Sequence, residues 1–365
     1  MFRLIKQWYY AKFDSNEPAI FLVTSILAVL VILFLGNLLI PVLAGIVIAY
    51  LLDAVVGFIS RIFKIHRLLA VYLVFMLFVA ILVLLLFFLL PQIVHQAGEF
   101  LKSIPAQVNS LKQTVASLAE KYPHVVSQGQ IQNTLAALSN VQFDKLATIS
   151  QSLIKFSISS LTSVFTWLVD LFLVPMLAFF FLKDKETIIR WFVNMLPQDR
   201  GALAEVWADV RPQLGNYVKG KTIECVIVGF VTYLGFIVFK LDYSLLLAVL
   251  VGLSVFIPYI GMVLVTIPVI LIGLTQFGFS SDFFYMFVIY LIIQALDGNV
   301  LVPILYSEAL SLHPVAVIAS VLIFGGLWGF WGLFFAIPLA ALINSGIKVW
   351  MGRKKKPILK VESEA

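Results

Sequence analysis

Polar and ionisable side chains gather in one short stretch of an otherwise strongly apolar region. The stretch QALDGNVLVPILYSEALSLHP holds Asp297, Asn299, Glu308 and His313, with long apolar runs on both sides. A carboxylate inside an apolar run is expensive to bury, so it tends to face a cavity, a partner group or an ion. Asp297 is therefore the first candidate for chemistry, as a carboxyl that exchanges a proton or as a ligand for a cation.

The residues around Asp297 show which other groups could act with it. Residues 241–347 contain no Lys and no Arg, so any cationic partner would come from another part of the chain. We predict a substrate or ion pathway formed by Asp297, Gly298, Asn299 and Pro303. The alternative is structural: Asp297 and Asn299 would then only satisfy a turn at Gly298, because Asp and Asn are comparable capping residues. For Glu308 and His313, which precede Pro314, we expect turn roles.

Two further stretches predict interrupted helices. The motif IPYIG places Pro258, Tyr259 and Gly261 in the middle of apolar residues 244–277, and we assign these three residues to the same pathway. Irregular backbone at membrane depth is tolerated only where protein or a water-filled cavity covers it, and transporters use such breaks to build sites. The other reading is a simple turn between two spans. A second break is predicted within Gly325–Pro338, in the run IFGGLWGFWGLFFAIP.

Three more acids lie in or beside apolar runs. Glu224 follows Lys221 by three residues, a spacing that favours a local ion pair on a helix, although a coupling role is the alternative. Asp53 and Asp170 stand alone near the ends of their apolar runs, and we expect them to be solvated.

Composition sets the class of protein. Hydrophobic residues make up 62% of the 365 and charged residues 12%, with a mean hydropathy of +1.05, whereas soluble domains are about half apolar and about a quarter charged. Several runs approach the roughly 20 residues that a membrane-spanning helix needs. We predict an all-α polytopic membrane protein with about seven or eight membrane segments, some broken or re-entrant, plus amphipathic external helices.

The apolar runs divide the chain into four regions. Residues 1–90 are expected to form a hairpin of two helices, broken at Gly36-Asn37, followed by a third span. Residues 91–155 form an external amphipathic region, with apolar positions three and four apart from Phe100 to Tyr122 and a second stripe from Leu138 to Phe156. Residues 156–347 form the transport core, including a cytoplasmic segment at 183–221 with a separate interfacial helix from Leu203 to Tyr217. Residues 348–365 are a basic tail.

The basic residues predict the orientation of these regions. Three lie in residues 1–18, three in 61–67, seven in 183–221 and six from Lys348 onward. Cytoplasmic segments of membrane proteins carry an excess of Lys and Arg. Both termini and 183–221 should therefore face the cytoplasm, with 91–155 outside.

Four C-terminal segments carry a resemblance: LVPMLAFFFLKDKE, LGNYVKGKTIECVIVGF, LAVLVGLSVFIPYIGMVLVTIP and the long segment from DGNVLVP at Asp297 to Ile343. In order and spacing they resemble the autoinducer-2 exporter family of permeases, especially its PerM-like branch. The resemblance implies a transporter that forms a homo-oligomer, for example a pentamer. Asp297 stands where many members have Glu, and Lys221 where Gln is common. These departures leave the cargo open.

The function predicted from these features is a secondary permease or exporter for a small neutral polar or cationic solute. The alternatives are a cation/proton antiporter and a membrane scaffold that binds partners through its external helices. No nucleophile–base pair, P-loop or Cys/His cluster is visible, so we predict no enzyme activity, no metal site and no cofactor. The expected partners are the lipid bilayer, the solute and further copies of the chain, but not nucleic acid.

Overall fold

A computed structural model describes residues 17–121, 161–195, 201–258, 260–306 and 312–352. Every regular element within those ranges is helical, which confirms the predicted all-α class. Six helical stretches among the described residues are long and apolar enough to cross a membrane: Leu38–Phe63, Arg67–Leu111, Ala204–Val238, Ile260–Phe277, Ser281–Tyr306 and Trp331–Lys348. Three shorter apolar helical stretches accompany them: Leu171–Lys183, Ser244–Ser254 and Pro314–Gly329. The chain is a multi-pass membrane protein.

The chain divides into two compact units, and each is described by itself. The first unit comprises Met1–Val71, Val174–Lys219 and Glu308–Ala365. It contains the helices α2 (Glu17–Phe63), α8 (Lys185–Met195) and α14 (Pro314–Gly352), with parts of α3 (Arg67–Leu84), α7 (Leu161–Lys183) and α9 (Gly201–Val238).

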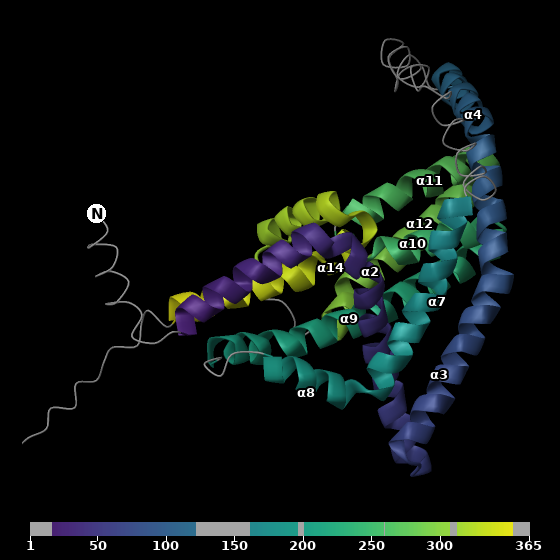
Figure 1. Cartoon of the computed structure of the whole chain (residues 1–365). Coiled ribbons are helices and arrows are strands. Elements are labelled where there is room, and N and C mark those ends of the chain that lie inside the picture. Colours follow the sequence, from purple (N-terminus) through teal and green to yellow (C-terminus); the bar gives the residue numbers. More distant parts are fainter. Residues whose placement is uncertain (1–16, 122–160, 196–200, 259, 307–311, 353–365) are drawn as a thin grey trace, which may run out of the picture. The chain divides into compact units, whose positions relative to one another are not determined.

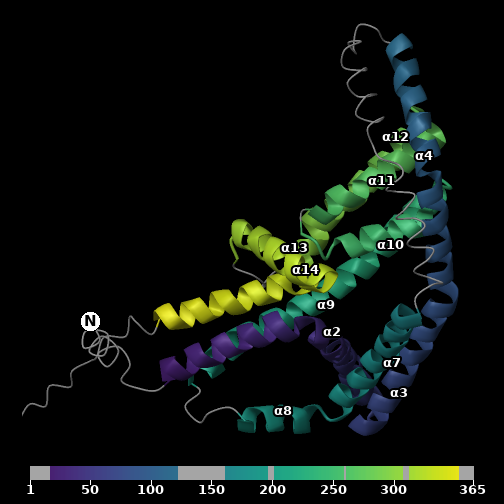
Figure 2. The ribbon, with the colours of Figure 1, turned by 45° about the horizontal axis from the view of Figure 1, so that its top comes forward.

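Helices α2, α9 and α14 are joined inside this first unit. α2 and α14 lie side by side (Figure 1). The Tyr217 hydroxyl of α9 donates to the Phe334 carbonyl of α14 at 3.2 Å, with the two rings 6.4 Å apart. α7 ends at Lys183, and the chain turns there into α8 (Figure 2).

The second unit comprises Tyr72–Leu173 and Gly220–Ser307. Its own helices are α4 (Leu90–Lys121), α10 (Ser244–Ser254), α11 (Ile260–Phe277), α12 (Ser281–Leu296) and α13 (Val302–Tyr306), with two π-helical stretches, η1 (Leu85–Leu89) and η2 (Asp297–Leu301). α10, α11 and α12 pack as neighbours (Figure 1). Their apolar core includes Val251, Ile272, Met286 and Tyr290, all 1% exposed or less.

Two expectations about helix boundaries are wrong. Residues 19–60 do not form a hairpin, because α2 continues without interruption from Glu17 to Phe63. Gly36-Asn37 is a weak helix position but does not stop the helix. Pro41, which lacks an amide hydrogen and clashes with the preceding turn, lies inside α2, and the helix bends along its length (Figure 1).

The predicted helix at 203–217 is confirmed as helix, but it does not end before the membrane span that follows it. It is the first half of α9, which runs unbroken from Gly201 to Val238. The amphipathic stripe that starts at Phe100 is confirmed as helix α4 as far as Lys121, while the stripe from Leu138 to Phe156 lies outside the described residues.

Both predicted helix interruptions are present. α10 ends at Ser254 and α11 begins at Ile260. α10 has 11 residues and is about 16 Å long, too short to cross a hydrocarbon core of about 30 Å. The second break is at Gly329 inside α14, where φ is 59° and ψ is −133°, a conformation that favours glycine. The depth of both breaks in a membrane remains a prediction.

Candidate functional site

A buried ion pair on α9 forms the centre of the candidate site. Lys221 Nζ contacts the two Glu224 oxygens at 3.0 and 2.9 Å, and the two side chains are 10% and 3% exposed. The local pair expected from the sequence is confirmed. A buried pair needs further hydrogen bonds to offset its lost hydration, so the partners of Glu224 beyond Lys221 matter.

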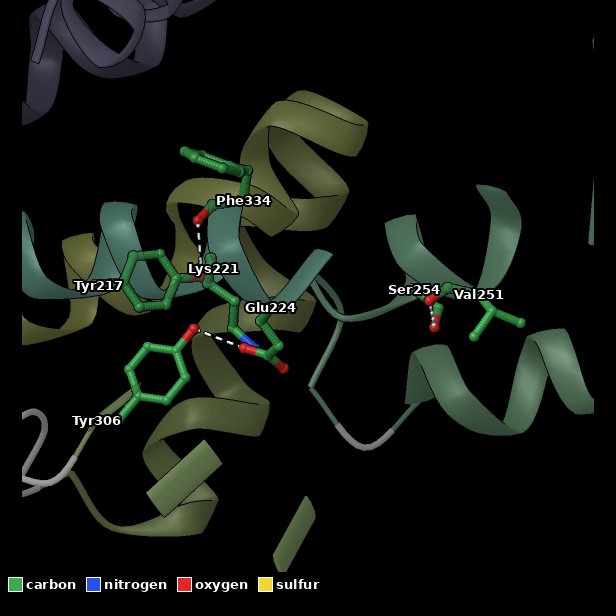
Figure 3. Close-up of polar contacts among 7 residues, drawn as sticks. All are labelled: Tyr217, Lys221, Glu224, Val251, Ser254, Tyr306 and Phe334. Atoms are coloured by element: carbon green, nitrogen blue, oxygen red, sulfur yellow. Dashed lines mark hydrogen bonds and ion pairs between the residues drawn. The ribbon is translucent and has the colours of Figure 1, made fainter. Parts of the chain in front are cut away.

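Tyr306 from α13 supplies such a bond. Its hydroxyl donates to Glu224 Oε2 at 2.6 Å, and the ammonium group of Lys221 lies 5.3 Å from the centre of the Tyr306 ring (Figure 3). Gly220 permits this approach, because a Cβ atom there would lie 2.6 Å from the Tyr306 ring. Tyr306 was not predicted from the sequence, because it is 82 residues from its partner Glu224.

Asp297 occupies the first position of η2, inside a helix that continues from Ser281 to Tyr306. Its Oδ1 atom is buried and has no hydrogen-bond partner among the described residues. Glu224 and Lys221 act on it electrostatically, but neither side chain forms a hydrogen bond or ion pair with it. Asp297 is thus an incompletely satisfied carboxyl beside a satisfied ion pair.

The backbone around Asp297 is a π-helical turn and not the tight turn considered for Gly298. Pro303 explains the widening, because a proline cannot donate to the Asn299 carbonyl four residues earlier and its ring collides with that group. The Asn299 side chain donates back to the Ala295 carbonyl at 2.8 Å, so it serves its own helix. Single π-helical turns inside α-helices are frequent at functional sites.

A short polar chain continues along α12 from Asp297. Gln294 Nε2 donates to the Tyr290 hydroxyl at 3.1 Å, and that hydroxyl is 2.8 Å from the Thr266 hydroxyl of α11. Tyr290, Gln294 and Asp297 are spaced by four and three residues, which places them on one helix face. Gln294 and Tyr290 are buried.

α9 runs beside this face. Its Phe236 ring stacks on Tyr290 at 6.1 Å, while a Cβ at Gly235 would contact Ile293 at 3.3 Å. Thr232 of α9 is fully buried, and its hydroxyl has no hydrogen-bond partner among the described residues. We call the groups Lys221, Glu224, Thr232, Thr266, Tyr290, Gln294, Asp297 and Tyr306 the polar row.

The other predicted pathway residues either serve the local backbone or are exposed. A Cβ at Gly261 would lie 2.0 Å from the Ser254 carbonyl oxygen, so this glycine lets α11 start against the last turn of α10. Pro258 is half-buried in the connecting turn, and Tyr259 lies outside the described residues. Gly298 and Pro303 are exposed, and a Cβ at Gly298 would contact nothing within 4 Å. The structure therefore brings Asp297 and Glu224 into one region, while Pro258 and Gly261 serve the helix break.

A second polar cluster lies in the first unit. Asp53 of α2 accepts from Arg67 at 3.0 Å and from Lys185 at 2.7 Å. Arg67 also donates to the Leu182 carbonyl at 3.2 Å. The expectation that Asp53 is a lone solvated acid is wrong, because α3 and α8 bring cations to it.

Three residues singled out in the sequence remain: His313 and Glu308 of the first stretch, and Asp170. The His313 imidazole accepts from the Val315 amide at 3.3 Å at the start of α14, which confirms its turn role. Glu308 lies outside the described residues, and the side chain of Asp170 is likewise not described. Within the described ranges, no three His, Cys, Asp or Glu side chains are grouped as a metal site would require.

Apolar spanning helices, interrupted helices and a buried polar row define a polytopic transport protein. Residues 22–352 match the family described as AI-2E family transporter, and the chain belongs to that family. It is 44% identical over 350 residues to the protein named "Putative permease PerM" of Escherichia coli K12, covering 96% of this chain and 98% of that protein. The resemblance read from the four C-terminal segments is therefore confirmed.

More distant relatives are also named as transport proteins. The chain is 25% identical over 321 residues to "Putative transport protein YueF" of Bacillus subtilis, covering 86% of this chain and 84% of the relative. It is 29% identical over 192 residues to "Putative transport protein YrrI" of the same organism, covering 52% and 54%. The names of these relatives refer to a permease or to transport proteins, which supports a transporter without naming its cargo.

Proposed function

We propose that this chain is a secondary permease that exports a small neutral polar or cationic solute along the polar row of α9 and the α12–η2–α13 helix. The observation that carries the proposal is the buried Oδ1 of Asp297, which has no hydrogen-bond partner among the described residues. An unsatisfied carboxyl is costly inside a membrane protein, and ionisable residues within membrane helices mark substrate or ion pathways.

The charges of the polar row support this cargo. Lys221 and Glu224 neutralise each other, so Asp297 adds one negative charge when it is ionised. A region with that balance attracts a cation or a proton and repels an anion. Tyr306, Gln294 and Thr266 add hydroxyl and amide groups that suit a neutral polar solute.

The same carboxyl favours a second candidate, a cation/proton antiporter. In that case Asp297 would bind a proton and a metal cation alternately. The two candidates differ in what moves against the proton: a polar organic solute in the first, Na⁺ or K⁺ in the second. A scaffold without transport activity would move neither.

Reconstitution of the purified chain into liposomes tests these functions. An inward-acidic pH gradient is imposed, and its collapse is followed with a pH-sensitive dye after addition of Na⁺, K⁺ or a panel of neutral polar solutes. Collapse by a solute supports the permease, and collapse by a cation alone supports the antiporter. Asp242→Asn, which alters an exposed acid, is the matched control for Asp297→Asn.

We also propose the orientation and assembly. Lys and Arg cluster in residues 1–18, 61–67, 183–221 and the tail, which supports cytoplasmic termini in a bacterial inner membrane with the end of α4 outside. A homo-oligomer is proposed from the family resemblance. In a Cys225→Ala background, a cysteine at exposed Gln113 of α4 should be labelled in intact cells by a membrane-impermeant reagent. Labelling only after permeabilisation would reverse the orientation.

A further inference from the structure

A cavity of about 250 Å³ lies at the junction of α2, α3 and α8, within the first unit. Its charged lining consists of three cations, Arg61, Arg67 and Lys185, and two acids, Asp53 and Glu186. Three positive charges against two negative ones leave one net positive charge. None of its lining residues belongs to the polar row.

The α2 wall of the cavity is one helix face. Asp53, Gly57, Ser60 and Arg61 follow each other at spacings that align them along the helix. A Cβ placed on Gly57 would contact nothing within 4 Å. The glycine therefore leaves free space in the wall between the acid and Arg61.

Only part of this positive charge is paired with acidic side chains of the protein. One carboxylate, Asp53, faces both Arg67 and Lys185, whose side chains stay 38% and 41% exposed. Arg61 is exposed and makes no ion pair with any described residue. The cations thus retain hydrogen-bond donors for an anionic group entering the cavity.

α8 adds an apolar surface beside the cavity. Ile188, Trp191, Phe192 and Met195 recur at spacings of three and four, while Arg190 lies on the opposite side. No residue of α8 is buried, and Trp191 and Phe192 are 55% and 59% exposed. α8 follows directly on α7, an apolar helix that ends at Lys183. An amphipathic helix at that place is typical of the membrane interface.

We propose that the α2–α3–α8 cavity binds the headgroup of an anionic phospholipid, while the apolar face of α8 lies in the acyl region beside it. The phosphate would meet Arg61, Arg67 and Lys185, as basic pockets between membrane helices bind anionic lipid headgroups. A zwitterionic lipid binds less well, because its ammonium group meets the same cations. Asp53 opposes the bound phosphate, so its removal strengthens binding.

The test is native mass spectrometry of the full-length purified chain with added phosphatidylglycerol, phosphatidylethanolamine or inorganic phosphate. We expect retained phosphatidylglycerol in excess of phosphatidylethanolamine. Arg61→Gln should lower the phosphatidylglycerol affinity about fivefold, as expected for one basic side chain beside an anionic lipid. Gly57→Phe should abolish binding by filling the free space, and Asp53→Asn should raise the affinity. Arg211→Gln, the same charge change at an exposed site elsewhere in the first unit, should leave it unchanged.

Three results would overturn the proposal. In the first, the Arg61, Gly57 and Arg211 variants all retain phosphatidylglycerol equally. In the second, inorganic phosphate at equal concentration displaces the lipid, which would indicate a site for free anions. In the third, Phe192→Asp changes the oligomeric mass but not lipid retention, which would assign the α8 face to a second copy of the chain.

Discussion

Asp53 and Asp297 are two acids within apolar helices, and the protein treats them differently. Asp53 in the first unit receives two cations by direct contacts of 3.0 and 2.7 Å and stays 27% exposed. Asp297 in the second unit has a buried oxygen without a hydrogen-bond partner among the described residues, although a buried ion pair lies within electrostatic reach. Basic residues follow Asp53 at 61–67 and none lies near Asp297 in the sequence, but only packing decides which of them reaches the carboxylate.

The contrast separates structural acids from candidate functional ones. An acid whose lone pairs are all used holds helices together, and its replacement mainly affects stability. An acid left partly unsatisfied costs stability and is kept for another reason. Glu224 belongs to the first kind by its contacts with Lys221 and Tyr306, and it positions the charges around Asp297.

The largest effect is expected from Lys221→Met. The change leaves Glu224 buried without its cation, which should lower the free energy of unfolding by about 3–5 kcal/mol. Thermal unfolding of the purified protein in detergent measures this loss. The double variant Lys221→Met/Glu224→Gln should recover most of it, because no uncompensated charge remains. A single variant as stable as the parent would show that the pair is hydrated and not buried.

Tyr306→Phe should have the second-largest effect on the free energy of unfolding. It removes the hydroxyl that donates to Glu224 at 2.6 Å while keeping the ring under Lys221. A hydrogen bond to a charged group is worth about 1.5–3 kcal/mol, and the loss should appear in the same unfolding assay. Tyr285→Phe, which alters an exposed tyrosine of α12, is the control. If both variants were equally stable, the Tyr306 hydroxyl would contribute nothing to the stability of the ion pair.

Asp297→Asn should change transport and leave stability nearly unchanged. We expect the transport rate in liposomes to fall at least tenfold, a barrier change of about 1.4 kcal/mol, with unfolding within about 0.5 kcal/mol of the parent. Asn keeps the shape but cannot ionise. If the variant transported like the parent between pH 5 and 9, Asp297 would be a structural acid like Asp53, and the proposed role of Asp297 in transport would be wrong.

Asp53→Asn should have the smallest effect. Its ion pairs are partly exposed, and such pairs contribute about 0.2–1 kcal/mol each. We therefore expect a stability loss of about 1 kcal/mol and parent-like transport of the solute. A loss of transport with normal folding would instead give the Asp53 cluster a role in the transport cycle.

The sequence predicted the local features of the candidate site and missed the distant ones. The Lys221–Glu224 pair follows from a spacing of three residues on a helix, and the α10–α11 interruption follows from Pro258 and Gly261. The π-helical turn at Asp297 was not predicted, because Gly298 favours a tight turn and the widening depends on the clash between Pro303 and the Asn299 carbonyl. Tyr306, Thr232 and Tyr290 carry no local signal that separates them from other apolar-run residues.

The sequence by itself determined the class of protein, the family and the two helix interruptions between α10 and α11 and inside α14. Those properties depend on composition, on motifs and on the backbone limits of Pro and Gly, which act within about four residues. Tertiary structure decided which acids are satisfied. The partners of Asp53 are 14 and 132 residues away, and that of Glu224 on α13 is 82 residues away. Only the packing of whole helices sets such distances, so the contrast between Asp53 and Asp297 exists in the folded chain alone.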